Sequence, residues 1–168
     1  MDAQQLRAIQ TPIKERFRAE PETAVGVLTA VGQVDFDRLT VSMIRERPFP
    51  EKLGLHPMTG GDGAAGCAAE LLLEALVGCA GVTLAAVCTA MEIPISDAKL
   101  RAEGRLDFRG TLGVNREVPV GFESVVLHFD LQSADSDEKL NKAVQLAERY
   151  CVVAQSVNSV QVSWNRIE

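Results

Sequence analysis

One long segment of the chain carries almost no charge. In residues 68–91 the only charged side chains are those of Glu70 and Glu74, both near the start, and residues 75–90 carry none. A transmembrane helix needs about 20 consecutive apolar residues, and this uncharged stretch is shorter than that and rich in Ala, Gly and Cys. We therefore predict a helix that is buried on all sides inside a soluble protein.

The length of the chain limits how much protein can surround such a helix. The chain has 168 residues, which corresponds to about one domain. Because one domain of this size can barely enclose a long helix, we expect a second copy of the chain to cover part of it. Gly78 and Gly81 lack side chains and would let another backbone approach closely. The segment therefore favours a homodimer.

The charge balance argues against some classes of partner. The 17 Lys and Arg residues against 23 Asp and Glu residues give a net charge of -6, which repels phosphate backbones. Aromatic residues make up only 5% of the chain, so stacking on nucleic acid bases is not expected. We therefore expect no nucleic acid partner, and the shortness of the apolar stretch argues against a membrane.

Cysteine and histidine usage indicates reduced thiols rather than a metal site. The four cysteines include no CxxC pair, and His56 and His128 lie far apart, so we expect no metal ion and no disulfide scaffold. The N-terminal residues show no apolar segment behind a basic start, which is the pattern of a secretory signal. We expect a cytoplasmic protein with free thiols.

Hydrophobic periodicity divides the first part of the chain into short elements. An amphipathic helix is predicted for residues 3–18, although Pro12 interrupts it. Alternating apolar residues predict strands at 24–33 and 36–47, joined near Val34–Asp35.

Beyond the central helix the period of two returns. Residues 100–108 and 122–132 each predict a strand with one apolar and one wet face. A helix of about 14 residues follows Ser136, and a final strand has the sequence VQVSWNRI. The order β-β-α-β-β-α-β predicts an α+β fold with antiparallel sheets.

The Gly-rich loop and the central helix resemble a known family. The segment GGDGAAGCAAELLLEALVGCAGVTLAAV is similar to the signature of the OsmC/Ohr family, the osmotically inducible protein C and organic hydroperoxide resistance proteins. A second signature of that family, a helix ending in A-E-x-x-C, matches AERYC at 147–151. The matched positions in the central helix are Glu70, Leu71, Leu72, Ala75, Leu76, Cys79, Thr83 and Leu84.

The resemblance implies a domain organisation and an assembly. It covers most of the chain, so we expect an OsmC-like domain at 24–168 and a helical N-terminal extension at 1–23. Members of the family have antiparallel sheets packed around a long buried central helix. They form intertwined homodimers with their sites at the interface, and the resemblance implies the same assembly here.

The resemblance also implies a chemistry. Cys79 would be the peroxidatic thiolate, which attacks the O–O bond of a hydroperoxide and becomes a sulfenic acid, and Cys151 would be the resolving thiol. An external dithiol would reduce the resulting disulfide, and no cofactor or metal is implied. The apolar residues around Cys79 favour organic hydroperoxides. Such a peroxidase would act in defence against oxidative or osmotic stress.

A thiolate inside an apolar helix needs support, because burial alone raises the pKa of a thiol. Cys79 lies far from the start of its predicted helix, so it needs a cation from elsewhere. The resemblance implies an Arg held by a Glu, and Glu70 matches that Glu. A helix turns by about 100° per residue, which puts Glu70 and Cys79 on opposite faces. Either the helix begins after Glu70, or Glu70 serves the site of a partner subunit, or it only stabilises the helix start.

Several cations are candidates for this Arg. Arg45 and Arg47 share one face of a predicted strand with Met43, and this is the core face if the strand keeps its register. Arg38 and His56 are alternatives, the latter because it lies just before the Gly-rich loop. Each of these side chains could equally be solvated.

The second signature departs from the family at one point. The family's second cysteine is usually followed by Pro, whereas here Val152 follows Cys151, which alters the turn that presents the thiol. Cys67, at the start of the central helix, is an alternative resolving thiol.

Two further functions compete with the peroxidase. One is an OsmC-fold dimer that binds a small molecule and has weak or no peroxidase activity. The other is a structural dimer in which Cys79 only packs. The peroxidase predicts an Arg near Cys79, whereas the binding protein predicts an apolar cavity with no cation near the sulfur.

Overall fold

Alternating apolar side chains give the sheet of this protein one dry face. The computed structural model describes residues 2–45, 52–157 and 160–168. In the two central strands, β3 (Asp97–Asp107) and β4 (Phe122–Gln132), buried positions alternate with more exposed ones, as the sequence predicted. The buried positions form the core together with the helices that cover them.

In the described part of the chain, five strands form one sheet in the order β2-β1-β3-β4-β5. The remaining strands are β1 (Val25–Asp35), β2 (Thr40–Ile44) and β5 (Val160–Arg166). The turn between β1 and β2 occupies residues 36–39, later than the predicted junction at Val34–Asp35. The Asp35 carboxylate accepts hydrogen bonds from the N–H groups of Asp37 and Arg38, each at 3.0 Å, and so closes the turn after itself.

The strands pair in antiparallel fashion except at one edge. Strand β5 runs parallel to β4, whereas the sequence predicted antiparallel pairing. A parallel neighbour requires a long crossover. The chain between the two strands supplies it with helix α4 (Asp137–Tyr150) and the short helix α5 (Val152–Ser156). The predicted α+β class and the order of the main elements are confirmed.

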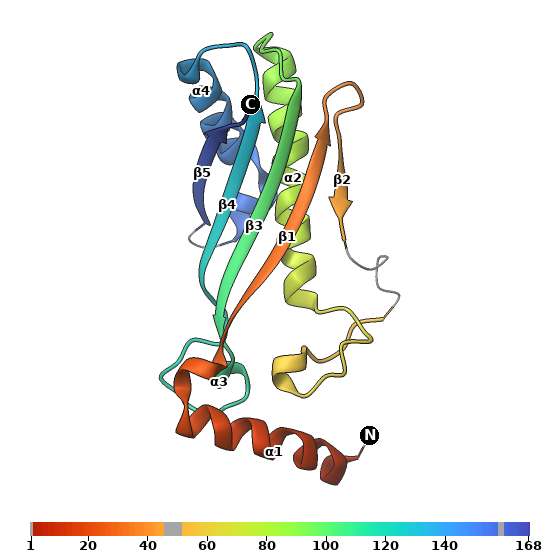
Figure 1. Ribbon diagram of the computed structural model, residues 1–168, viewed down its shortest axis with the longest axis vertical. Coiled ribbons are helices and arrows are strands. Elements are labelled where there is room, and N and C mark those ends of the chain that lie inside the picture. The colour runs from red at the N-terminus through yellow and green to blue at the C-terminus, as the bar shows by residue number, and fades with distance from the viewer. Residues whose placement is uncertain (1, 46–51, 158–159) are drawn as a thin grey trace.

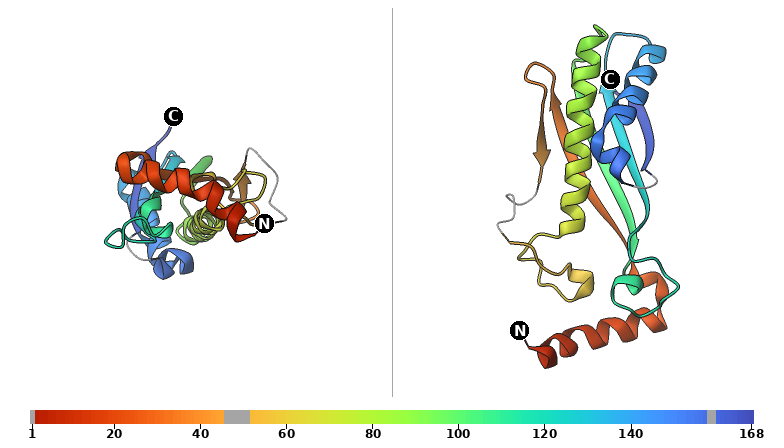
Figure 2. Two further views of the ribbon diagram at one scale, coloured as in Figure 1. Left: turned by 90° about the horizontal axis from the view of Figure 1, so that it is seen from below. Right: turned by 180° about the vertical axis from the view of Figure 1, so that it is seen from behind.

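Helix α2 (Ala68–Ala90) runs along the dry face of the sheet with α4 beside it (Figures 1 and 2). Gly81 allows close packing, because a Cβ there would lie 2.6 Å from Val41 Cγ2 in β2. Gly81 therefore receives the sheet of its own chain rather than a second chain, which corrects the prediction. Nothing described lies within 4 Å of a Cβ built at Gly78.

Helix α2 is buried on one side only. Leu76 and Leu84 are in the core, whereas Leu72 and Val82 are 42% and 40% exposed. The predicted burial on all sides is therefore wrong for a single chain. By length and composition alone α2 could cross a membrane, but its packing against the sheet is that of the core helix of a soluble fold.

Helix α1 (Ala3–Ala19) lies across one end of the sheet (Figure 1). It continues through Pro12 and is not interrupted there as predicted. Proline removes one intrahelical hydrogen bond, while tertiary contacts hold the helix on both sides of it. Phe17 is fully buried, and Gln10 Nε2 donates to the Thr59 carbonyl at 3.0 Å. The remaining short elements are η1 (Pro21–Ala24), η2 (Pro57–Thr59) and α3 (Phe108–Thr111).

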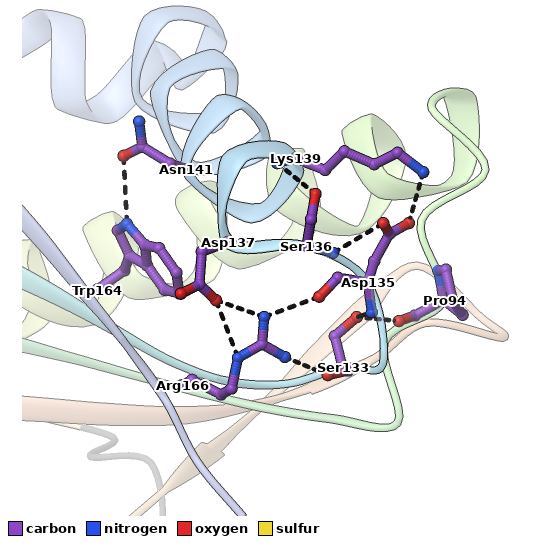
Figure 3. Close-up of polar contacts among 9 residues, drawn as sticks. All are labelled: Pro94, Ser133, Asp135, Ser136, Asp137, Lys139, Asn141, Trp164 and Arg166. Atoms are coloured by element: carbon purple, nitrogen blue, oxygen red, sulfur yellow. Dashed lines mark hydrogen bonds and ion pairs between the residues drawn. The ribbon is translucent and has the colours of Figure 1, made fainter.

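Arg166, the last residue of β5, ties this strand to the start of α4 (Figure 3). Its Nε donates to the Asp137 carboxylate at 3.0 Å, and its Nη2 donates to the Asp135 carbonyl at 2.8 Å. A further hydrogen bond goes to the Ser133 carbonyl. The crossover is thereby fixed at the end of α4 that lies farthest from α5.

Candidate functional site

Two cysteines from different elements lie in contact. Cys79 is in the middle of α2, and Cys151 is the residue between α4 and α5. The Cys151 thiol donates a hydrogen bond to the sulfur of Cys79. Cys151 is fully buried, whereas Cys79 is half-buried. The site therefore combines one enclosed thiol with one that is partly accessible.

The start of α5 supplies hydrogen-bond donors to both sulfurs. The first N–H groups of a helix have no partner within that helix. Here the N–H of Ala154 donates to the sulfur of Cys151 at 3.4 Å, and the N–H groups of Val152 and Val153 donate to the sulfur of Cys79. Cys79 lies far from the start of its own helix, as predicted, but a short helix that the sequence did not predict begins at Val152.

The two thiols differ in acidity. Burial raises the pKa of the Cys151 thiol to about 11, and the neighbouring Cys79 raises it as well. Burial also acts to raise the pKa of Cys79, but hydrogen bonds from Val153, Cys151 and Val152 outweigh it and hold that pKa below its ordinary value. Of the two thiols, Cys79 is therefore the one that ionises at the lower pH.

Thr83 adds a less constant donor one turn along α2. Its hydroxyl donates to the Cys79 carbonyl at 2.8 Å, and it also contributes to lowering the pKa of the Cys79 thiol. Because a hydroxyl has one proton, it supports the sulfur only when it turns away from that carbonyl. The backbone N–H groups are therefore the constant donors.

An open, apolar hollow of about 580 Å³ lies between α2, β4 and α5, and the two residues that follow Cys151 are part of its lining. Val152 and Val153, which donate to Cys79, also form part of its wall. Phe122 packs over Gly104, where a Cβ would lie 2.5 Å from the ring. The full lining consists of Leu72, Ala75, Gly121, Phe122, Val125, Val152, Val153, Ser156 and Val157. The hollow is suited to an apolar group.

Cys79 also lies on the open side of α2. It recurs at helical spacing with four exposed apolar residues. Together these residues, which we call the open stripe, are Leu72, Ala75, Cys79, Val82 and Ala86. In a single chain this surface faces solvent.

Arg45 pairs with a glutamate of α2 that was not predicted from the sequence. Arg45 donates through Nε and Nη2 to the two carboxylate oxygens of Glu74, each at 2.7 Å, and this pairing raises the pKa of Arg45. The signal that could have found Glu74 is its position one turn after Glu70, on the same face. Glu74 and Cys79 are separated by about 140° around the helix and point to different sides of α2.

The predicted Glu70 lies inside the helix. Because α2 begins at Ala68, the alternative that the helix starts after Glu70 is wrong. The charge of Glu70 acts on His56 instead. Arg47 lies outside the described residues.

His56 precedes η2 and packs against the first residue of α3. Its ring stacks on Phe108 with the ring centroids 4.9 Å apart, and its Nδ1 accepts the N–H of Met58 at 3.1 Å. Burial lowers the pKa of His56, against an opposing contribution from Glu70. His56 is therefore a neutral packing residue at this position.

The remaining candidate site residues are two cysteines and one arginine. Cys67 is the N-cap residue of α2, and Cys88 is in the core, where burial raises its pKa to about 11. Arg38 pairs with Asp35 at 3.9 Å with its side chain 82% exposed. Within the described ranges, no group of three or more His, Cys, Asp or Glu residues could hold a metal ion.

Comparison with known proteins shows the same fold elsewhere. The family model for OsmC-like protein matches residues 61–165, which is more than half of the chain. A search of curated proteins gave no match. Among solved structures, the OsmC-like protein from Mycoplasma pneumoniae is 13% identical, with a TM-score of 0.59 over 86% of this chain and 96% of that chain.

Two other solved structures are similar in fold. An OsmC-like hydroperoxide resistance protein from Jannaschia sp. CCS1 is 20% identical, with a TM-score of 0.56 over 86% of this chain and 94% of that chain. An organic hydroperoxide resistance protein OsmC from Legionella pneumophila is 15% identical, with a TM-score of 0.53 over 83% of this chain and 96% of that chain.

Proposed function

Because the chain belongs to the OsmC-like protein family, we propose that it is a cysteine-based peroxidase for organic hydroperoxides, with Cys79 as nucleophile and Cys151 as resolving thiol. The observation that carries this proposal is the cysteine pair itself, in which one thiol is more acidic and the other less acidic than usual. Neighbouring groups whose pKa values are pushed apart are typical of divided chemical roles. The hydroperoxide resistance proteins of the same fold support it.

The first step breaks the peroxide. The Cys79 thiolate attacks the terminal oxygen of ROOH, so that an S–O bond forms while the O–O bond breaks. The leaving alkoxide takes the proton of the adjacent Cys151 thiol and departs as the alcohol ROH. Cys79 is now a sulfenic acid, oxidised by two electrons, and Cys151 is a thiolate.

The second step closes a disulfide, and the third step opens it. The Cys151 thiolate attacks the sulfur of the Cys79 sulfenic acid, an S–S bond forms, and hydroxide leaves and is protonated to water. An external dithiol then attacks the disulfide. It returns both cysteines to the reduced form and leaves as its own disulfide.

We also propose that two chains form a homodimer through the open stripe. An extended apolar surface in solvent marks a contact site, and Gly78 next to it leaves room for a close approach. A second chain seated there would cover Cys79 and enclose the hollow. We propose Glu70 as the residue that the second chain contributes and keep Arg45 and Arg47 as candidates for the cation at Cys79. The cytoplasmic location and the role in stress defence are likewise proposals.

The test follows the thiols by mass spectrometry when the reduced protein meets cumene hydroperoxide and, separately, hydrogen peroxide. We expect Cys79 to be oxidised far faster than Cys67 of the same chain, faster by the organic peroxide, and to stop at a disulfide with Cys151. Cys79→Ser should abolish the fast phase, and Cys67→Ser is the matched control that keeps it. Oxidation of Cys79 at the rate of Cys67 would rule the peroxidase out.

The hollow itself favours a second function, the binding of a small apolar molecule. Its lining is largely apolar and includes Val152 and Val153, which follow Cys151 in the chain. Calorimetric titration with cumyl alcohol, which has no O–O bond, measures such binding without oxidation. Tight binding to the wild type and to Cys79→Ser, combined with slow thiol oxidation, would favour the binding protein over the peroxidase.

A further inference from the structure

A second hollow lies where the end of α1 meets α3 (Figure 1), and we call it the α1 hollow. Its volume is about 180 Å³, whereas sites for drug-sized ligands occupy about 300–1,000 Å³. None of the described residues that line it also lines the hollow beside α5. Its lining consists of Phe17, Arg18, Pro21, Arg109, Val114 and Asn115. The α1 hollow is therefore a separate site with room for a small molecule only.

One arginine of the α1 hollow is fixed by a carboxylate that is almost fully buried. The side chain of Asp107 is 3% exposed, and its Oδ2 accepts hydrogen bonds from Arg109 Nε at 3.0 Å and from Arg109 Nη2 at 2.6 Å. Within the described ranges, the remaining guanidinium nitrogen, Nη1, has no hydrogen-bond partner. Because a guanidinium is planar and donates from all three nitrogens, Arg109 keeps donors in a fixed position for a ligand.

The other two polar side chains of the lining also have hydrogen atoms to donate. Asn115 accepts the N–H of Glu117 through Oδ1 at 2.9 Å, which leaves both hydrogens of its Nδ2 available. Arg18 is exposed in the last turn of α1, and no described residue forms a hydrogen bond or an ion pair with it. The lining therefore suits a ligand that is rich in acceptor atoms.

The charges around the α1 hollow suit a ligand with one negative charge. Arg18 and Arg109 each carry a positive charge, and Asp107 offsets one of them. Glu22 and Glu123 also act on Arg109 from outside the lining. Their negative charges repel a ligand with two negative charges more strongly than a ligand with one. A carboxylate, which has one charge and two acceptor oxygens, meets both conditions.

We propose that the α1 hollow binds a small organic monocarboxylate, whose carboxylate lies between Arg18 and Arg109. Planar carboxylate groups match the fork of a guanidinium, and charge-assisted hydrogen bonds are the stronger class. The apolar part of the ligand would lie against the three apolar lining residues, Phe17, Pro21 and Val114. Since one arginine belongs to α1 and the other to α3, the ligand would join the N-terminal helix to the segment that follows β3.

The experiment is an NMR titration of the isotopically labelled protein with benzoate at constant pH and ionic strength. Benzamide, which has nearly the same shape and no charge, is the matched control ligand. We expect benzoate to shift the side-chain N–H signals of Arg109 and Asn115 up to a saturating value, and benzamide to leave them in place. Equal shifts with the two compounds, or no shift with benzoate, would overturn the proposal.

Replacement of Arg18 tests the arginine that α1 supplies. Arg18→Gln should weaken benzoate binding about ten-fold, because hydrogen bonds between charged groups are among the stronger polar contacts. Arg7→Gln is the matched control. Arg7 is also exposed and lies on the same face of α1, about 16 Å away along the helix, so its replacement changes the net charge equally and should leave the affinity unchanged. Equal affinities of the two variants would contradict the proposal.

Arg109→Lys tests the second arginine without leaving the buried Asp107 unpaired. Lysine keeps the positive charge but lacks the rigid fork, so one ammonium group would have to serve Asp107 and the ligand together. We expect benzoate to bind about ten-fold more weakly. A lysine variant that binds as tightly as the wild type would overturn the proposal. If Arg109→Lys does not fold, Arg18→Gln still decides the test, because it changes an exposed side chain.

Two further observations separate this site from the proposed peroxidase. Cys79→Ser should bind benzoate as tightly as the wild type, because neither cysteine of the pair lines the α1 hollow. Shifts confined to Val125 and Val157, which line the hollow beside α5, would place benzoate there and overturn the proposal. A protein that binds benzoate in the α1 hollow but reacts slowly with cumene hydroperoxide keeps this site and loses the peroxidase.

Discussion

At the scale of single residues, the site assigns one proton to one of two sulfurs. Cys151 is enclosed by the core and keeps the proton, and Cys79 is partly accessible and gives it up. Since the two groups interact directly, a change at either one alters the titration of the other.

This division predicts different midpoints in the pH profiles of alkylation for the two thiols. Only the thiolate reacts, so alkylation speeds up as pH rises towards the pKa and then levels off. We expect the midpoint for Cys79 to lie below the ordinary thiol pKa, and Cys151 to react only as the pH approaches about 11. In Cys79→Ser the Cys151 midpoint should fall, because the charge that opposes its ionisation is gone. Coincident midpoints in the wild type, measured by mass spectrometry, would contradict this.

Cys88 shows the effect of burial without a thiol partner, and it predicts a loss of stability in alkali. It is 1% exposed, and burial raises its pKa from 9.0 to about 11. The folded state therefore keeps a proton that the unfolded state loses, and the free energy of unfolding falls as pH rises from the lower value to the higher. The full loss is about 3 kcal/mol for a shift of about two units.

The measurement is urea denaturation of the reduced protein across this pH window. Cys88→Ala lacks the titrating thiol, so its stability should fall less steeply with pH than that of the wild type. If the free energy of unfolding falls equally steeply with pH in the two proteins, burial does not raise the pKa of the Cys88 thiol.

Sequence reasoning found the two cysteines but not the groups that act on them. Both were found because they occupy the cysteine positions of the two segments that resemble OsmC/Ohr signatures. The N–H of Val152 has no signature of this kind, because every residue except proline carries one. The choice of Glu74 over Glu70 as the partner of Arg45 depends on where β2 meets α2, which only the tertiary structure determines.

At the scale of elements, the two sides of α2 serve different purposes. One side fits against the sheet so closely that a Cβ at Gly81 would meet Val41 and Val34, and the other side has open space at Gly78. The hydrophobic pattern predicted that α2 is a helix, but the pattern is apolar all round and cannot tell the two sides apart.

Replacing each of these two glycines by alanine should distinguish the packed side of α2 from its open side. Gly81→Ala places a methyl group 2.6 Å from Val41 Cγ2, and such overpacking costs about 1–3 kcal/mol. Gly78→Ala meets nothing described within 4 Å and should stabilise a single chain by about 0.5–1 kcal/mol, because glycine is the poorer helix former. Urea denaturation at high dilution compares them. Equal effects of the two substitutions would contradict the packing.

The direction of the last strand is the main element that periodicity did not predict. An alternating pattern identifies β5 as a strand but is the same for either direction. The direction follows from the crossover through α4 and α5, and the sequence CVVAQSV gave no helical period for the second of these.

At the scale of the whole molecule, the open stripe leaves an apolar surface that contains the reactive sulfur. Val27 on β1, which is 56% exposed, lies on another element. A substitution on the open stripe and a control substitution at Val27 can therefore test whether the stripe mediates association.

A charge on the open stripe should prevent association. Val82 is 40% exposed, and a glutamate there would have to be desolvated between two chains, which is unfavourable for an unpaired charge. We expect Val82→Glu to sediment as a monomer at concentrations where the wild type is a dimer, and Val27→Glu to remain dimeric. A Val82→Glu protein that associates like the wild type would show that the stripe is not the interface.

The donors of Cys79 also bear on how the sequence can diverge. Because all residues except proline present the same N–H, substitutions can accumulate at positions 152 and 153 without removing a hydrogen bond to the sulfur. Two distant relatives could share this means of activating a thiol and have no side chain in common there. An insertion between α4 and α5 is different, since one added residue would carry both N–H groups away from the sulfur while leaving every cysteine in place.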